Sequence, residues 1–199
     1  MTRIFWIVFV LAALVNSTAR GQTELVSSEW FPTGVGTSWT YRVPDGKIIV
    51  KVTKHEKQGE FICARFETLD KGEVVAVQDV AVTADKVRRV AHDGEKVQPP
   101  LELLPLPAAK GKKWAIDSKM ISRGGSDAIQ GTFATDEEDV KVPAGEFKKA
   151  IRVTGEITIN GQATTIRSWY APKFGLIKQR IVLGTQIHEM ELEKMEPPK

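Results

Sequence analysis

Residues 142–178 read VPAGEFKKAIRVTGEITINGQATTIRSWYAPKFGLIK and contain the clearest structural signal in the chain. In Ile151–Ile159, apolar side chains occupy alternate positions, interrupted at Gly155, and polar side chains lie between them. This period of two is typical of a strand with one buried face. The pair Asn160-Gly161 favours the positive φ angles of a tight turn. We therefore expect the next run, Ala163–Ala171, to fold back and complete a hairpin.

Short apolar runs separated by Gly, Asn and Asp continue on both sides of this hairpin. The expected strands are one that ends at Val43, then Lys47–Lys54, Glu60–Leu69, Glu73–Thr83, Lys86–His92, Lys113–Arg123, Ala128–Thr135, Leu176–Leu183 and Thr185–Glu193. Pro99-Pro100 lacks backbone donors, so residues 95–112 are expected to cover the sheet without joining it. The pattern predicts an all-β or β-rich α+β fold. We expect an antiparallel meander curled into an open barrel or curved sheet with a small covering segment.

The first residues have the features of an export signal. Arg3 precedes the apolar run Ile4–Val15, and Asn16–Gly21 is small and polar, like a signal-peptidase site. The alternative is an uncleaved anchor, but about twenty apolar residues are needed to cross a bilayer. We predict a signal peptide over 1–21, a single β-rich domain over 22–196 and a disordered tail over 197–199. The mature protein is then exported, periplasmic or extracellular, and is not transmembrane.

Charge and cysteine content narrow the range of partners. Removal of residues 1–21 takes away two arginines and no acid, so the formal charge falls from +3 to +1. Nucleic acid is therefore not an expected partner. The basic runs Lys86–Arg89 and Lys110–Lys113 are interpreted as solvated faces and turns. Cys63 is the single cysteine, which excludes an intrachain disulfide, and its apolar neighbours predict a buried structural role.

Motifs of known enzymes are absent from the sequence. It contains no nucleophile elbow, phosphate-binding loop, dinucleotide fingerprint or zinc-protease motif. His55, His92 and His188 are far apart, whereas a zinc site needs three or four converging ligands. The run Asp136–Asp139 lacks the spaced carboxylates of a calcium loop and is interpreted as a solvated turn. We predict a non-enzymatic protein without catalytic residues, metal or cofactor; a hydrolase whose carboxylates meet only in space is the third alternative.

Aromatic side chains gather near expected strand starts and turns. The candidate ligand-binding residues are Trp39, Tyr41, Phe66, Trp114, Trp169 and Tyr170. In one interpretation such residues close the ends of the core. In the other they line the mouth of an apolar cavity, whose walls would include residues such as Ile48, Phe66, Val80 and Ile157. The corresponding functions are binding of a lipid, lipoprotein part or other apolar ligand in the concavity of the sheet, and binding of an envelope protein through a sheet edge or aromatic patch.

Three motifs carry a family resemblance. They are FPTGVGTSWTY at 31–41, VPAGEF at 142–147 and WYAPKFGLIK at 169–178. Together they resemble the bacterial exported proteins of the TapB-like, uncharacterised-domain family. That family is similar, more distantly, to the periplasmic lipoprotein carriers of the LolA/LolB kind. The resemblance implies export and, for the carriers, a curved sheet that holds acyl chains, although this chain lacks clear cover helices. It implies no catalytic residue.

Overall fold

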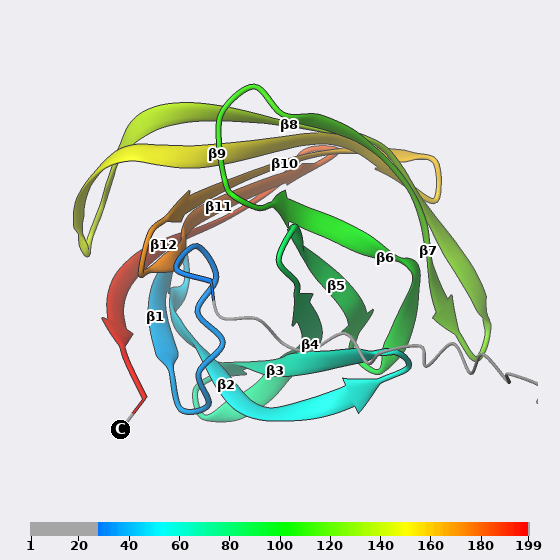
Figure 1. Ribbon diagram of the computed structural model, residues 1–199, viewed down its shortest axis with the longest axis horizontal. Coiled ribbons are helices and arrows are strands. Elements are labelled where there is room, and N and C mark those ends of the chain that lie inside the picture. Colours follow the sequence, from blue (N-terminus) through cyan, green and yellow to red (C-terminus); the bar gives the residue numbers. More distant parts are fainter. Residues whose placement is uncertain (1–27, 199) are drawn as a thin grey trace, which may run out of the picture.

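The strands of the computed structural model, which describes residues 28–198, form a closed antiparallel barrel (Figure 1). In chain order they are β1 (Ser38–Val43), β2 (Gly46–Gln58), β3 (Phe61–Asp70), β4 (Glu73–Val82), β5 (Lys86–His92), β6 (Glu95–Pro105), β7 (Lys113–Ser122), β8 (Gly125–Val142), β9 (Gly145–Ile159), β10 (Gln162–Ala171), β11 (Gly175–Leu183) and β12 (Gln186–Glu196). Each strand pairs with its neighbours in sequence. The predicted all-β antiparallel meander is confirmed. Within these residues no helix is long and apolar enough to cross a membrane. The signal peptide predicted over residues 1–21 lies outside the described part.

The barrel is closed, whereas the sequence led us to expect an open one. The last strand pairs with the first, starting with Glu191 opposite Arg42, and it continues past the expected end at Glu193. Its final residues, Met195 and Glu196, lie opposite Trp39 and Ser38 of β1. Because β1 also pairs with β2, the first and last strands join and the described sheet has no free edge. Closure satisfies backbone groups that an edge strand would leave unpaired.

Residues 95–105 form strand β6 of the barrel wall, so the prediction of a covering segment over 95–112 was wrong for most of its length. The prolines end strand pairing, as expected, but on only one edge of β6. Pairing of β6 with β7 covers three residue pairs and ends at Gln98, just before Pro99. On the other side, Leu101 and Leu104 lie opposite Arg89 and Val87 of β5. Both leucines are buried, and this burial holds the segment in the wall.

The hairpin that opened the sequence analysis is confirmed. Asn160 and Gly161 have φ angles of 50° and 78°, as a tight turn between two strands requires. Gln162 lies opposite Ile159, which sets the register of the pair β9–β10. The acidic run 136–139 is not a turn, however, because β8 continues through it to Val142. Opposite it on β9, Arg152 forms ion pairs with Asp136 at 3.3 Å and Glu138 at 2.6 Å, which explains acids within a strand.

The break at Gly155 in the apolar alternation has a packing cause. Phe133 of β8 lies directly opposite Gly155 of β9. A Cβ atom at Gly155 would lie 2.7 Å from both Cδ1 and Cζ of the Phe133 ring. The ring therefore occupies the space that a side chain would take. Glycine is needed at this position because of the packing of Phe133 and not because of an unusual backbone angle.

The two ends of the barrel differ. Because every strand is antiparallel to the next, the turns fall alternately at opposite ends. The turns after β8 and β10 and the segment before β1 lie at one end, which we call the plugged end. The turns after β1, β3, β5, β7, β9 and β11 lie at the other, which we call the mouth.

Candidate functional site

The barrel encloses a cavity of about 230 Å³. Its wall is formed by inward-facing side chains from most of the strands, and most of these side chains are apolar. Three of the four wall residues suggested by the sequence, Ile48, Phe66 and Val80, line it, whereas Ile157 is buried in the core without reaching it. A volume of about 150 Å³ is enough to bind a benzene-sized molecule. The cavity can therefore hold the apolar part of a small ligand.

Phe31 and Pro32 close the plugged end of this cavity. The Phe31 ring lies edge-on to Phe66, with 5.4 Å between ring centroids, and 6.4 Å from Tyr170. Pro32 packs against Gly175, where a Cβ atom would lie 3.0 Å from the proline Cδ. The first family motif thus packs on the third, and both are needed to form this end of the barrel.

Two side chains of β1 form hydrogen bonds with the backbone of the third motif at this end of the barrel. Trp39 Nε1 donates a hydrogen bond of 2.7 Å to the carbonyl oxygen of Phe174, and the Tyr41 hydroxyl donates one of 2.7 Å to that of Leu176. Phe147 of the second motif meets the Phe174 ring edge-on at 5.0 Å. All three motifs therefore converge at the plugged end, although they are far apart in the sequence.

Four of the six candidate ligand-binding residues line the cavity. These are Trp39, Tyr41, Phe66 and Tyr170. Trp114 lies beside the wall, where its ring stacks on Phe133 at 5.5 Å and its Nε1 donates to the carbonyl oxygen of Glu102 at 3.2 Å. Trp114 lies directly opposite Phe133 in the β7–β8 pair, so both point to the same face of the sheet. Phe133 lines the cavity, and Trp114 packs beside it without lining the cavity itself.

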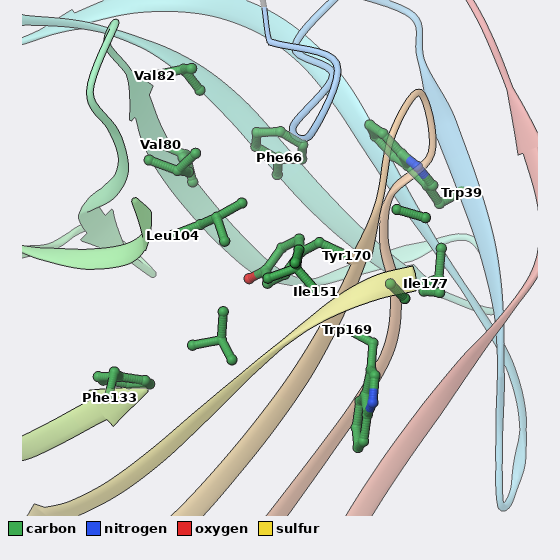
Figure 2. Close-up of a cluster of buried hydrophobic side chains, with 14 of the residues drawn as sticks. Trp39, Phe66, Val80, Val82, Leu104, Phe133, Ile151, Trp169, Tyr170 and Ile177 are labelled. Atoms are coloured by element: carbon green, nitrogen blue, oxygen red, sulfur yellow. The ribbon is translucent and has the colours of Figure 1, made fainter. Parts of the chain in front are cut away.

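Trp169 lies on the outer face of the barrel. It precedes Tyr170 in β10, and in Figure 2 the two rings point in different directions, with Tyr170 directed toward Leu104. Trp169 Nε1 donates to a carboxylate oxygen of Glu138 at 2.5 Å, and the Lys178 ammonium lies 5.8 Å from the ring centroid. These contacts leave 7% of the residue exposed. The residue lines a hollow on the outer surface and does not reach the internal cavity.

The mouth end has a second hollow of about 550 Å³. It is bordered by the β1–β2 turn and the start of β12. Four residues line both this hollow and the internal cavity: Ile48, Gln179, Ile181 and Met190. A ligand longer than the internal cavity can therefore extend along these side chains to the mouth.

Arg89 is the wall residue that the sequence analysis missed. The run Lys86–Arg89 was interpreted as a solvated face, but Arg89 lines the cavity. Its Nε atom is inaccessible to solvent and has no hydrogen-bond partner within the described residues. Burial lowers the pKa of its guanidinium group. The sequence did contain a signal for an arginine in the barrel interior. Successive side chains of a strand point to opposite faces, so one of Arg88 and Arg89 has to face inward.

Other polar side chains share the cavity wall with Arg89. Gln179 Nε2 donates to the Ser168 hydroxyl at 3.0 Å, and Ser168 hydrogen-bonds to the Tyr170 hydroxyl. Burial raises the pKa of Tyr170 to about 12, while the charge of Arg89 acts in the opposite direction. Tyr170 is therefore a neutral hydroxyl at physiological pH. The wall combines a large apolar surface with one cation and a few neutral hydrogen-bonding groups.

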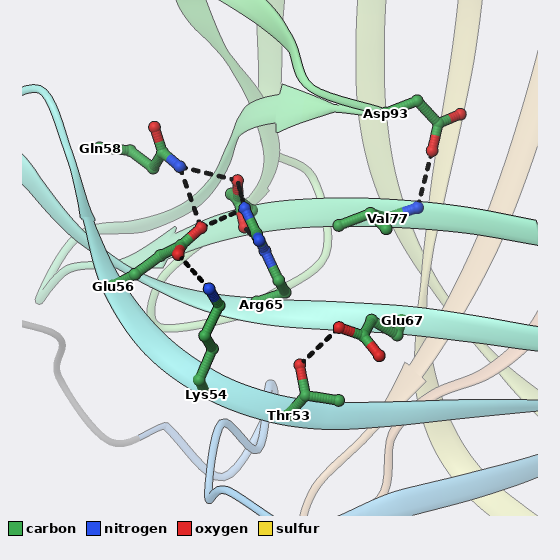
Figure 3. Close-up of polar contacts among 9 residues, drawn as sticks. Thr53, Lys54, Glu56, Gln58, Arg65, Glu67, Val77 and Asp93 are labelled. Carbon is green, nitrogen blue, oxygen red and sulfur yellow. Dashed lines mark hydrogen bonds and ion pairs between the residues drawn. The ribbon is translucent and has the colours of Figure 1, made fainter. Parts of the chain in front are cut away.

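The outer face of β2, β3 and β4 has its own polar network (Figure 3). Arg65 donates hydrogen bonds of 2.9 and 3.0 Å to the two oxygens of Asp79, and it also pairs with Glu56. Gln58 Nε2 donates to Asp79 at 3.0 Å. Each charged side chain of this network has a partner of opposite charge, which indicates a structural role. In the described part of the chain, no cluster of three or more His, Cys, Asp or Glu side chains could hold a metal ion.

Comparison with known proteins gives a likeness of fold. No family model matches the chain, and no curated protein matches it in sequence. A crystal structure from Parabacteroides distasonis, assigned as a lipoprotein, is 14% identical over 86% of this chain and 100% of its own, with a TM-score of 0.53. A Bacteroides fragilis protein assigned as exported, with a YmcC-like fold, is 14% identical over 85% of this chain and 100% of its own, with a TM-score of 0.44. The lipoprotein YmcC of Escherichia coli is 14% identical over 81% of this chain and 85% of its own, with a TM-score of 0.42. At these identities the likeness concerns the fold alone, and it is the Parabacteroides structure that carries it.

Proposed function

We propose that this protein is an exported, non-enzymatic carrier that binds an apolar ligand, such as a lipid or the acyl part of a lipoprotein, inside its barrel. The observation that carries the proposal is the apolar cavity of about 230 Å³ that continues into the hollow at the mouth. A concave, mostly apolar site with a few polar groups is the usual form of a small-molecule site. Four of the six candidate aromatics lie in its wall.

Export is supported by the leader-like first residues and by the resemblance of the three motifs to TapB-like exported proteins and, more distantly, to LolA/LolB-like carriers. The structure of similar fold from Parabacteroides distasonis is likewise assigned as a lipoprotein. The alternative function, protein binding through a sheet edge, has less support, because the described sheet is closed. An aromatic patch is also weakly supported, since Trp169 and Tyr170 are both buried.

The first experiment is native mass spectrometry of the protein purified from its own cell envelope, in which we expect a retained lipid. The second is titration of the delipidated protein with N-phenyl-1-naphthylamine, a neutral probe that fluoresces in apolar surroundings. Ile166 lines the cavity, so Ile166→Phe should fill part of it and weaken probe binding. Arg167→Phe, on the outer face of the same strand, is the matched control and should bind like the wild type. A wild-type protein that retains no lipid and binds no probe would refute the proposal.

A further inference from the structure

The cavity contains a positive charge without a counterion. Arg89 lies opposite Val80 of β4, and both residues line the cavity. Among residues 28–198 its guanidinium group forms no ion pair, and its Nε has no hydrogen-bond partner. Asp93 attracts this charge only over a longer distance. Arg89 is half-buried, and Nε is the guanidinium atom that is closed to solvent. Arginine remains protonated in proteins, and an unpaired charge partly withdrawn from water destabilises a fold. A residue of this kind needs a function that offsets its cost.

The surroundings of Arg89 have two distinct parts. On one side are the hydroxyls of Tyr170 and Ser168, with Gln179 bonded to Ser168. Toward the mouth, the wall includes the apolar side chains of Ile48, Ile181 and Met190, and Gln179 is the polar residue among the four shared by the cavity and the mouth hollow. A polar group held at Arg89 would therefore be joined to a chain that leaves along an apolar path.

We propose that the ligand is an amphiphile with a single carboxylate, whose headgroup pairs with Arg89 and whose apolar chain extends toward the mouth. This inference rests on the proposed function, because it assigns the chemistry of the ligand that the cavity takes up. The planar guanidinium fork matches a carboxylate in a bidentate pair. One half-buried cation balances one negative charge, whereas a doubly charged phosphate would leave a second charge in the cavity without a partner.

The test uses the delipidated full-length mature protein and displacement of N-phenyl-1-naphthylamine by three competitors of equal chain length: dodecanoate, dodecanol and dodecyl phosphate. Arg89→Met keeps most of the side-chain volume and removes the charge. We expect it to weaken dodecanoate binding at least tenfold and to change dodecanol binding by less than threefold. Arg167→Met removes an exposed arginine from the outer face and should change neither affinity.

The outcomes separate the two proposals. If the wild type does not bind the neutral probe, the proposed function fails. If the probe binds but dodecanoate has the same affinity for the wild type and Arg89→Met, the inference fails and the proposed function stands. Tighter binding of dodecyl phosphate than of dodecanoate would overturn the assignment of a single negative charge.

Two measurements keep the inference testable if Arg89→Met folds poorly. In the wild type, ¹³C NMR of bound [1-¹³C]dodecanoate should show a carboxyl pKa below that of the free acid, because the cation favours the charged form. A raised value would overturn the inference. Where Arg89→Met does fold, its ligand-free form should have a higher unfolding temperature than the wild type, since a half-buried unpaired charge has been removed. A clearly lower temperature would overturn the inference, because the empty barrel would then stabilise this charge without a ligand.

Discussion

Substitution of Gly155 by alanine tests the packing of the barrel wall directly. The backbone of Gly155 has an ordinary φ angle, so alanine introduces no backbone strain. The added methyl group would, however, overlap the Phe133 ring, whose Cδ1 and Cζ atoms lie 2.7 Å from the position of the new Cβ. Phe133 is 5% exposed and its ring stacks on Trp114, so the ring cannot move away from Gly155 without disturbing this stacking.

The expected magnitude follows from two opposing effects. Overpacking a well-filled core costs about 1–3 kcal/mol. Replacing glycine restricts the unfolded chain and offsets about 0.4–1 kcal/mol of that cost. We expect a net loss of about 1–2 kcal/mol in the free energy of unfolding. For a barrel of this size, that corresponds to a fall of about 2–8 °C in Tm.

The assay is urea denaturation of four proteins in a double-mutant cycle: the wild type, Gly155→Ala, Phe133→Ala and the double variant. Phe133→Ala alone should cost about 3–5 kcal/mol. In the Phe133→Ala background, Gly155→Ala should no longer destabilise the protein, because the ring that it overlaps is absent. It should be neutral or raise the free energy of unfolding by up to about 1 kcal/mol. Gly124→Ala is the matched control, because its Cβ would meet no atom within 4 Å and its φ angle is ordinary. The same loss from Gly155→Ala in both backgrounds would refute the assigned contact.

Two further predictions concern charged groups. Burial, together with the charge of Arg89, lowers the pKa of His92 from its ordinary value of 6.5. As the pH falls, His92 is therefore protonated in the unfolded chain before it is protonated in the folded protein. The free energy of unfolding should then fall as the pH drops below about 6.5. Thermal unfolding between pH 7 and 5 should show a shallower decline for His92→Gln, and an identical decline would contradict this account. On the outer face, Asp79 is 3% exposed and accepts two hydrogen bonds from Arg65. Asp79→Asn should therefore cost about 1–3 kcal/mol in urea denaturation, whereas Lys47→Gln, at the exposed pair with Glu193, should leave the midpoint within error.

The sequence predicts strands well where alternation and turn residues agree. Ile151–Ile159 and its Asn160-Gly161 turn were located because both signals are present. The prediction fails where a local rule acts on only one edge of a strand. Pro99 and Pro100 end the pairing of β6 with β7, but the opposite edge of β6 remains free to pair with β5. Composition alone does not show that a strand has two edges with different partners.

The inward position of Arg89 illustrates a different limit, which concerns the phase of the alternation. The β4–β5 register shifts between Asp79 and Val80, and the β5–β6 register shifts between Arg89 and Ala91. A shift of one residue exchanges the inner and outer faces. In strict alternation Arg88 and Arg89 are equivalent candidates for the inner face, and hydrophobicity favours neither. Only the cross-strand partner decides, and Arg89 faces Val80 across the ladder, on the face where the cavity lies. Aromatic chemistry singled out four residues of the wall together with two that do not line it, Trp114 and Trp169. The inward position of Arg89 depends on register irregularities that only the assembled barrel reveals.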